Sequence, residues 1–374
     1  MPINYLYLDD EIIEDTQSIA DLLNSENNSL KIKVKNPLSF PKQIQQFKDL
    51  KIDGLILDLR LDQRKNNDEK AEYRASTLAQ EIRTRTTEGL IPSFPIVICS
   101  TDTKLKRSYE KAIVGQDLFD SKYLKNEEMI DESKKVADEL VSLAQGYKQL
   151  NQIKGKKKSI VLSDFFGLSD KQLQLIDNRL IKHSFGTSLQ LPLYEYGRFI
   201  LKEMILKSGI LVDEITLLGR LGVSPKSPDL SKLLSKLKPF KYNGPFNEAW
   251  PRWWWPLVNN WWYGLKEGTP GLATINAEKR VEVLNKITKL KLVEEKPIEK
   301  IYSSKFGTVC QFYQKPLDSF DGLLLDMGYE PFPWQDSLYI SLKASVDPKI
   351  KAKNFTISSL DKQRFEDFKK LTNG

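Results

Sequence analysis

Acidic residues follow two apolar runs near the start of the chain. Residues 5–8 lead into Asp9, Asp10 and Glu11, and residues 55–57 lead into Asp58. Apolar runs of this kind are typical of buried parallel strands. Ligands bind outside the carboxyl ends of the strands in open α/β sheets, so these carboxylates are expected to meet at one site. The pattern indicates a phosphorylatable aspartate beside a metal ion.

Two further segments are predicted to reach the same edge of the sheet. The apolar run over 96–99 ends in Ser100, and a short strand near 118–119 leads into Lys122. Carboxylates that are crowded together repel one another unless a cation joins them. Mg²⁺ takes oxygen ligands and keeps several waters, so two or three carboxylates form a natural partial shell for it.

The elements that position these residues alternate between strand and helix over the first 125 residues. Such alternation predicts an α/β domain with a doubly wound, five-stranded parallel sheet. The Lys-rich strand over 30–34 is expected near the edge of that sheet. The polar segment over 63–73 is predicted to be a loop, and a helix is expected over about 103–114.

Four motifs in this order resemble the receiver domains of response regulators. They are Tyr-Leu-Asp-Asp-Glu at 7–11, Gly-Leu-Ile-Leu-Asp-Leu-Arg-Leu at 54–61, Pro-Ile-Val-Ile-Cys-Ser at 95–100 and Gly-Gln-Asp-Leu-Phe-Asp-Ser-Lys at 115–122. The resemblance covers roughly the first third of the chain, residues 1–128.

The resemblance implies a role for each residue of the site. Asp9, Asp10 and Asp58 would hold Mg²⁺, and Asp58 would accept a phosphoryl group from a histidine kinase or a small phosphodonor. Lys122 and Ser100 would each contact a phosphoryl oxygen. Phe119 would be the aromatic side chain that reorients when the Ser100 hydroxyl moves.

Charge and pattern divide the rest of the chain into further parts. Residues 151–374 hold 35 Lys and Arg against 24 Asp and Glu, whereas residues 1–150 hold 22 against 26. The receiver-like domain with a long last helix is predicted over 1–150, a basic linker over 151–158, and a mainly helical region over 159–270. A smaller α+β region is predicted over 271–374, with a winged-helix unit possible at 277–314. The basic excess suits nucleic acid or simply a solvated surface.

Two features of the C-terminal region suggest contacts. A helix, a glycine turn and a second helix over 213–241 resemble a helix-turn-helix unit or an ordinary helical hairpin. Four lysines would stud the second helix and its exit: Lys232, Lys236, Lys238 and Lys241. Six tryptophans between 250 and 262 are expected mainly in the core, whereas Trp253 and Trp262 point elsewhere and could offer a stacking surface.

These observations favour a cytoplasmic, response-regulator-like protein of two-component signalling. Its phosphorylated receiver would control an output region that binds nucleic acid or a protein partner. No apolar run reaches the roughly 18 residues of a membrane span, so no membrane partner is expected. No motif indicates an enzyme beyond self-phosphorylation and dephosphorylation of the receiver. The alternative is a pseudo-receiver that serves as a docking module in a multi-protein assembly, such as a defence system. The long loop after Asp58, Tyr123 in place of the family's proline, and the tryptophans favour that alternative.

Overall fold

The computed structural model describes residues 2–62, 71–101, 116–156, 162–185, 191–266, 268–353 and 355–373. The helix predicted over 103–114 lies outside these ranges, as does most of the loop predicted over 63–73. The chain forms two compact units. The first contains residues 1–168, 184–202 and 243–250, and the second contains residues 169–183, 203–242 and 251–374.

The first unit contains the predicted five-stranded parallel sheet. Its strands lie in the order β2-β1-β3-β4-β5, which is a doubly wound order. β3 and β4 are buried throughout, whereas β2 at the edge alternates between buried and exposed residues. The edge position predicted for the Lys-rich strand is thus confirmed. The strands are β1 (Ile3–Leu8), β2 (Leu30–Lys35), β3 (Gly54–Asp58), β4 (Ile96–Ser100) and β5 (Ser121–Leu124).

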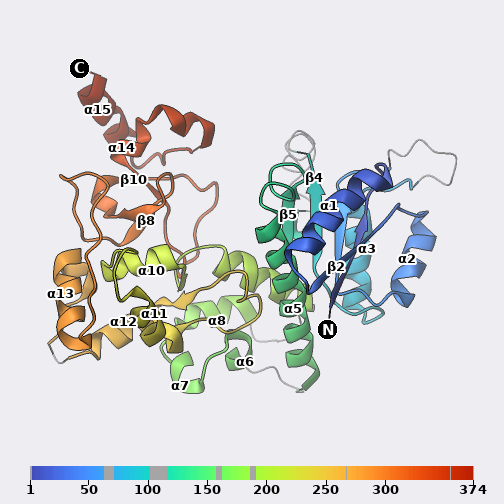
Figure 1. Cartoon of the computed structure of the whole chain (residues 1–374), viewed down its shortest axis with the longest axis horizontal. Helices are drawn as coiled ribbons and strands as arrows, with labels where there is room; N and C mark the ends of the chain where they lie inside the picture. Colours follow the sequence, from blue (N-terminus) through green and yellow to red (C-terminus); the bar gives the residue numbers. More distant parts are fainter. Residues whose placement is uncertain are drawn as a thin grey trace. The chain divides into compact units, whose positions relative to one another are not determined.

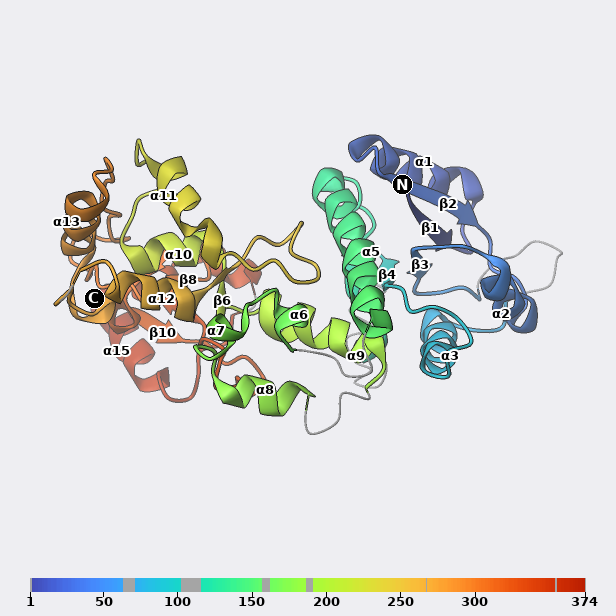
Figure 2. The same cartoon turned by 90° about the horizontal axis from the view of Figure 1, so that it is seen from below.

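Helices cover both faces of this sheet (Figures 1 and 2). α2 (Phe40–Asp49) and α3 (Ala75–Thr87) cover one face and enclose a core of Leu, Ile and Ala side chains. α1 (Ile13–Glu26) and α5 (Ser133–Lys156) pack together over the other face. There the hydroxyl of Tyr5 donates a hydrogen bond to the carbonyl of Leu140 at 2.7 Å.

α5 continues through most of the predicted linker. Its apolar spacing extends to the buried Leu150, and the Asn151 side chain donates to the carbonyl of Ser93 at 3.0 Å. The chain therefore stays helical through Lys156, and the linker prediction for 151–156 is wrong. The remaining two linker residues lie outside the described ranges.

Residues 184–202 and 243–250 pack within the first unit, so the units do not follow the predicted boundaries. The first of these segments contains α9 (Leu193–Arg198), which contacts α5, as α6 (Leu162–Phe166) also does. In segment 243–250, the Phe246 ring lies 6.0 Å from the Tyr147 ring, and its carbonyl accepts a 3.0 Å hydrogen bond from Ser142. A Cβ atom at Gly146 would lie 2.2 Å from the Phe246 ring, so only glycine allows this approach.

The second unit combines helices with two small sheets. One sheet has the order β10-β11-β8-β9, and the other pairs β6 with β7. This agrees with the predicted succession of a helical region and a smaller α+β region. The hairpin β8–β9 packs on α10, and its assignment to a winged helix remains a prediction. The strands are β6 (Leu211–Val212), β7 (Trp253–Trp254), β8 (Thr308–Cys310), β9 (Lys315–Leu317), β10 (Gly322–Leu324) and β11 (Tyr339–Ser341). The helices are α7 (Asp170–Leu173), α8 (Asn178–Phe185), α10 (Glu214–Leu221), α11 (Leu230–Leu237), α12 (Trp255–Tyr263), α13 (Ala277–Thr288), α14 (Leu342–Ser345) and α15 (Lys362–Asn373).

The tryptophan-rich stretch belongs mainly to the core. Pro256 stands in the first turn of α12, where its missing N–H costs nothing, so the helix begins at Trp255. Trp253 and Trp262 are both buried, and the Trp262 indole donates to the carbonyl of Pro270 at 2.8 Å. The alternative of a stacking surface on these two rings is therefore wrong.

None of the described helices is both long enough and apolar enough to cross a bilayer.

Candidate functional site

Three carboxylates converge at the carboxyl ends of β1 and β3. These strands are neighbours in the sheet, with Leu8 beside Leu57, so the residues that follow them meet. Asp9, Asp10 and Asp58 each offer an oxygen, and these oxygens lie within 4.8 Å of one another. Asp9 and Asp58 are each only 1% exposed. The structure thus brings together the three acids that the sequence singled out.

The lysine of this site is Lys125. Its Nζ lies 2.8 Å from carboxylate oxygens of both Asp9 and Asp58, and 3.0 Å from Glu11. Lys122 does not take this place, so that prediction is wrong. β5 extends from Ser121 to Leu124, which makes Lys122 an exposed residue within the strand and Lys125 the first residue beyond it.

Because the lysine of the site is Lys125 and not Lys122, its neighbours in the sequence also differ from those predicted. Asn126, not Tyr123, follows it, and Tyr123 is a buried strand residue whose hydroxyl donates to Glu139 at 2.7 Å. The described residues include no cis peptide bond. Tyr123 therefore offers no support for a docking surface at the site.

Burial and charge act against each other at Asp58. Burial, joined by repulsion from Asp9, raises its pKa to about 6, although Lys125 and the Arg60 backbone N–H favour the ionised form. The Arg60 N–H donates to the second Asp58 oxygen at 2.8 Å. Burial alone would lower the pKa of Lys125, but the surrounding acidic groups raise it above its usual value. Lys125 is therefore a permanent cation at neutral pH.

The Ser100 hydroxyl is a buried polar group of the site that has no hydrogen-bond partner among the described residues. Ser100 ends β4, beside β3, and is fully buried. Its Oγ makes no hydrogen bond with the part of the chain that the structure describes. An unsatisfied buried hydroxyl costs stability unless a ligand or water supplies a partner.

Phe119 lies elsewhere, and its predicted switching role is wrong. It precedes β5, next to Asp120, whose N–H bonds to the carbonyl of Ile96 at the start of β4. Ser100 pairs with Leu124 instead, at the opposite end of these strands. Phe119 is part of the apolar core. Lys122, not an aromatic residue, stands three residues before Lys125.

The residues present fit a magnesium ion. They supply hard carboxylate oxygens from adjacent strand ends, which is the donor set that Mg²⁺ takes. Lys125 now neutralises two of the three acids. A divalent cation would therefore share Asp9 and Asp58 with the ammonium group or displace it from one of them.

The fold of this unit is identified by its strand order. It is also identified by the three acids, the hydroxyl and the lysine at the carboxyl ends of the strands. The N-terminal unit has the receiver fold. Receiver fold here denotes the doubly wound order β2-β1-β3-β4-β5 with the acidic site at the carboxyl ends of the strands.

Solved structures of several proteins are similar to parts of this chain. A response regulator receiver domain protein from Clostridium thermocellum is 17% identical over 40% of this chain and 98% of its own, with a TM-score of 0.28. A two-component response regulator from Clostridium difficile is 18% identical over 36% and 94%, with a TM-score of 0.24. NtrX from Brucella abortus, in complex with ATP, is 12% identical over 65% of this chain and 57% of its own, with a TM-score of 0.32. No protein-family model and no curated relative matches the sequence.

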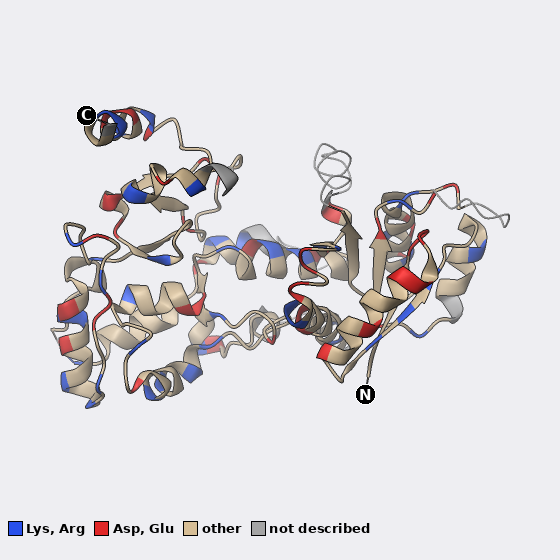
Figure 3. Ribbon diagram, turned by 45° about the horizontal axis from the view of Figure 1, so that its top comes forward, with Lys and Arg blue, Asp and Glu red and all other residues tan. Residues whose placement is uncertain are grey.

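The lysines predicted for nucleic-acid contact lie on and after α11 of the second unit. Lys232 is exposed and pairs with Asp229 at 2.8 Å, and Lys236 and Lys238 are also exposed. Lys241 is half-buried, with its Nζ 5.7 Å from the centre of the Trp253 ring. Lys and Arg lie among Asp and Glu on some helices of this unit, such as α13 and α15, whereas α11 carries lysine alone (Figure 3). The nucleic-acid role stays a prediction.

Proposed function

We propose that this chain is a cytoplasmic, response-regulator-like switch that is phosphorylated on Asp58 and binds Mg²⁺ through Asp9, Asp10 and Asp58. The observation that supports it is the ion pair of Asp58 with the Lys125 ammonium beside the end of the neighbouring strand β4. There the buried Ser100 hydroxyl has no hydrogen-bond partner among the described residues. Phosphoryl transfer depends on such positioning and charge neutralisation more than on covalent help from the protein.

Each residue has a defined part in the transfer. A carboxylate oxygen of Asp58 attacks the phosphorus of a phosphohistidine or a small phosphodonor. The new P–O bond forms as the P–N bond to the histidine breaks, and the imidazole leaves. Lys125 neutralises the added charge, and Ser100 donates a hydrogen bond to a phosphoryl oxygen. Bound Mg²⁺ would supply further charge neutralisation at the same oxygens.

Lys125 also links the site to the rest of the first unit. Before phosphorylation its ammonium joins the ends of β1, β3 and β5 through Asp9 and Asp58. A phosphoryl group on Asp58 offers Lys125 a more highly charged partner than a carboxylate. We propose that Lys125 then gives up its contact with Asp9, which changes how the end of β5 is held.

Intact mass after incubation with acetyl phosphate and Mg²⁺ tests this function. We expect a mass increase of one phosphoryl group in the wild-type protein and no increase in the Asp58→Asn variant. Asp62→Asn is the matched control, because Asp62 is paired with Arg60 at 2.8 Å, outside the acidic cluster. An adduct that persists in Asp58→Asn would refute the assignment.

The position of Lys125 also favours a second candidate, a pseudo-receiver used for docking. With its Nζ between Asp9 and Asp58 and also near Glu11, the lysine already acts as the counter-ion of the cluster. In that case neither Mg²⁺ nor acetyl phosphate would alter the protein, and the first unit would serve as a binding surface in a larger assembly.

The output of the switch is proposed to be binding by the second unit, with no separate enzymatic activity. Exposed Lys232 and Lys236 on α11 support duplex DNA as a target, with a protein partner as the other option. A gel shift on duplex DNA that weakens with salt and disappears in Lys232→Glu/Lys236→Glu would support DNA. No shift in the wild-type protein would leave a protein partner as the target, and a shift that persists in the variant would place DNA binding away from Lys232 and Lys236.

A further inference from the structure

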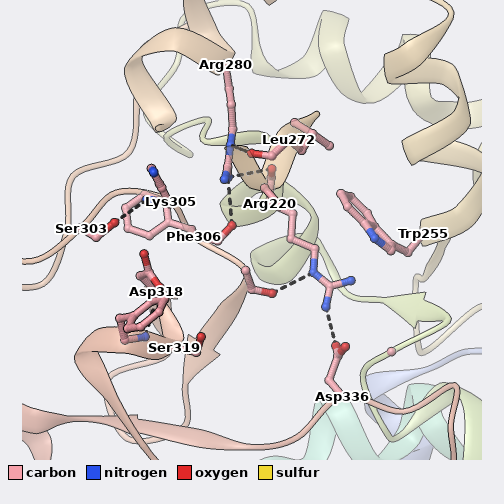
Figure 4. Close-up of a pocket in the computed structure, with 14 residues that line it drawn as sticks. Arg220, Trp255, Leu272, Arg280, Ser303, Lys305, Phe306, Asp318, Ser319 and Asp336 are labelled. Atoms are coloured by element: carbon pink, nitrogen blue, oxygen red, sulfur yellow. Dashed lines mark hydrogen bonds and ion pairs between the residues drawn. The ribbon is translucent and has the colours of Figure 1, made fainter. Parts of the chain in front are cut away.

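The second unit contains a cavity that the proposed function does not use. Its volume is about 740 Å³, within the range of small-molecule sites. The cavity lies between the helices α10, α12 and α13 and the segments 303–307 and 318–320 (Figure 4). All of the residues that line it belong to the second unit.

A buried cation that forms no ion pair with the described residues lines this cavity. Arg280 on α13 is 1% exposed. Its Nε and Nη1 groups donate only to backbone carbonyls, including that of Leu272 at 3.0 Å and that of Phe306 at 2.9 Å. Burial lowers the pKa of Arg280 to about 10, although the Asp318 carboxylate acts in the opposite direction. A negatively charged ligand would add to the partial counter-charge that Asp318 supplies.

Other side chains add charge and flat apolar surface. Arg220 pairs with Asp336 at 2.7 Å, and its guanidinium lies 4.8 Å from the centre of the Trp255 ring. Lys305 lines the cavity and is exposed. Phe320 lines it too and is 83% exposed, so its ring is open to solvent.

The Asp318 carboxylate limits which ligands would suit the cavity. Asp318 lines the cavity, is 8% exposed, and accepts a hydrogen bond from the N–H of Phe320 at 3.1 Å. A carboxylate accepts several hydrogen bonds, so it suits a ligand that carries hydroxyl or amino donors as well as an anionic group. A simple anion such as phosphate would gain nothing from Asp318 or from the aromatic rings.

From these contacts we propose that the cavity binds a nucleoside phosphate. Arg280 and Lys305 face the phosphate, the exposed Phe320 ring offers a flat surface to the base, and Asp318 accepts from a sugar hydroxyl or a base amino group. This proposal rests on the second unit alone and does not depend on phosphorylation of Asp58.

Isothermal titration of the full chain with AMP tests the proposal. We expect a dissociation constant below about 1 mM, with adenosine and inorganic phosphate each at least about tenfold weaker. Phosphate that binds as tightly as AMP would refute the role of the rings. Absence of AMP binding up to about 1 mM would refute the site.

Paired variants locate the binding. Lys305→Gln and Phe320→Ser should each weaken AMP about threefold to tenfold, because each removes one exposed contact. Lys300→Gln and Ile301→Ser should leave it unchanged, because Lys300 and Ile301 are exposed nearby but do not line the cavity. All four positions are exposed, so the fold should survive. Equal affinity in Lys305→Gln, Phe320→Ser and the wild-type protein would place AMP elsewhere and overturn the proposal.

Discussion

The Lys125 ammonium lies 2.8 Å from the carboxylate of Asp58, and both groups are almost completely buried. Neither charge has bulk water to solvate it, so each depends on its partners for stability. The pair joins the end of β5 to the end of β3, across the intervening strand β4. Any change in the charge of Asp58 therefore acts on Lys125.

Removal of the lysine should make the first unit dependent on a divalent cation. Lys125→Gln leaves three acids within 4.8 Å of one another without their ammonium group. In EDTA we expect a loss of about 3 to 5 kcal/mol in the free energy of unfolding, as for other broken buried pairs. Mg²⁺ should restore much of it, which thermal melts with and without the ion would show.

Lys122→Gln is the matched control for that experiment, since Lys122 lies three residues earlier and is exposed. It should melt as the wild-type protein does in EDTA and gain the same stabilisation from Mg²⁺. If Lys125→Gln were as stable as Lys122→Gln in EDTA, the ammonium group would not be the counter-ion of the cluster.

Asp58→Asn should remove a loss of stability that the metal-free wild-type protein shows as the pH rises. The folded-state pKa of Asp58 is about 6, against an ordinary value of 3.8, so the folded protein holds this proton more tightly than the unfolded chain. Stability is therefore lost as the pH rises from about 4 to 6, and asparagine escapes that loss. Its amide nitrogen replaces one of two accepting oxygens, so the variant also carries a cost that does not change with pH. Relative to the variant, the wild-type protein should lose about 1 to 3 kcal/mol between about pH 4 and 7.5. Melting curves across this range in EDTA would measure it, and a difference that is constant with pH would contradict the assigned shift.

The buried pair of Arg83 and Asp120 should be essential to the first unit. Asp120 accepts from Arg83 at 2.8 Å and from the Tyr147 hydroxyl at 2.7 Å, and it also caps the N–H of Ile96. Asp120→Ala leaves a buried guanidinium without its counter-ion and should cost about 3 to 5 kcal/mol. Denaturant unfolding would measure this loss.

The control is the pair of Arg85 and Glu81, also on α3, whose side chains are 26% and 32% exposed. Glu81→Ala should cost about 0.5 kcal/mol or less, as exposed pairs do. Similar losses in the two variants would show that burial does not govern the strength of these pairs.

Two neighbouring residues on α12, Trp262 and Tyr263, should differ in how much they contribute to the free energy of unfolding. Trp262 is fully buried, whereas Tyr263 is 52% exposed. Trp262→Ala should cost about 3 to 5 kcal/mol through the cavity it leaves, and Tyr263→Ala less than about 1 kcal/mol. Thermal unfolding of both variants would decide this, and equal losses would contradict the assignment of Trp262 to the core.

The parts of the fold that the sequence predicts have strong local patterns. β3 and β4 are fully buried apolar runs, so their positions and the residues that end them, Asp58 and Ser100, follow from the pattern. β5 has four residues, of which only Tyr123 is buried, so the pattern does not locate its end and does not distinguish Lys125 from Lys122. The sequence signal for Lys125 is the pair of apolar residues, Tyr123 and Leu124, between the two lysines.

The second unit was harder to predict because its strands are short and its contacts are distant in sequence. Strands of three residues such as β8 and β11 show no useful alternation, yet Tyr339 pairs with Cys310. Arg280 likewise appears in the sequence as one more charged residue on an amphipathic helix. Only the folded chain shows that it is buried beside the cavity.

Transfer of a phosphoryl group to three matched proteins tests the central claim most directly. Wild-type protein, Lys122→Gln and Lys125→Gln are incubated with acetyl phosphate and Mg²⁺, and the fraction phosphorylated is followed by intact mass. We predict equal rates for the wild-type protein and Lys122→Gln, and a rate at least about tenfold lower for Lys125→Gln because a buried neutralising charge is lost. Phosphorylation of Lys125→Gln at the wild-type rate, or no phosphorylation of any of the three, would contradict the account.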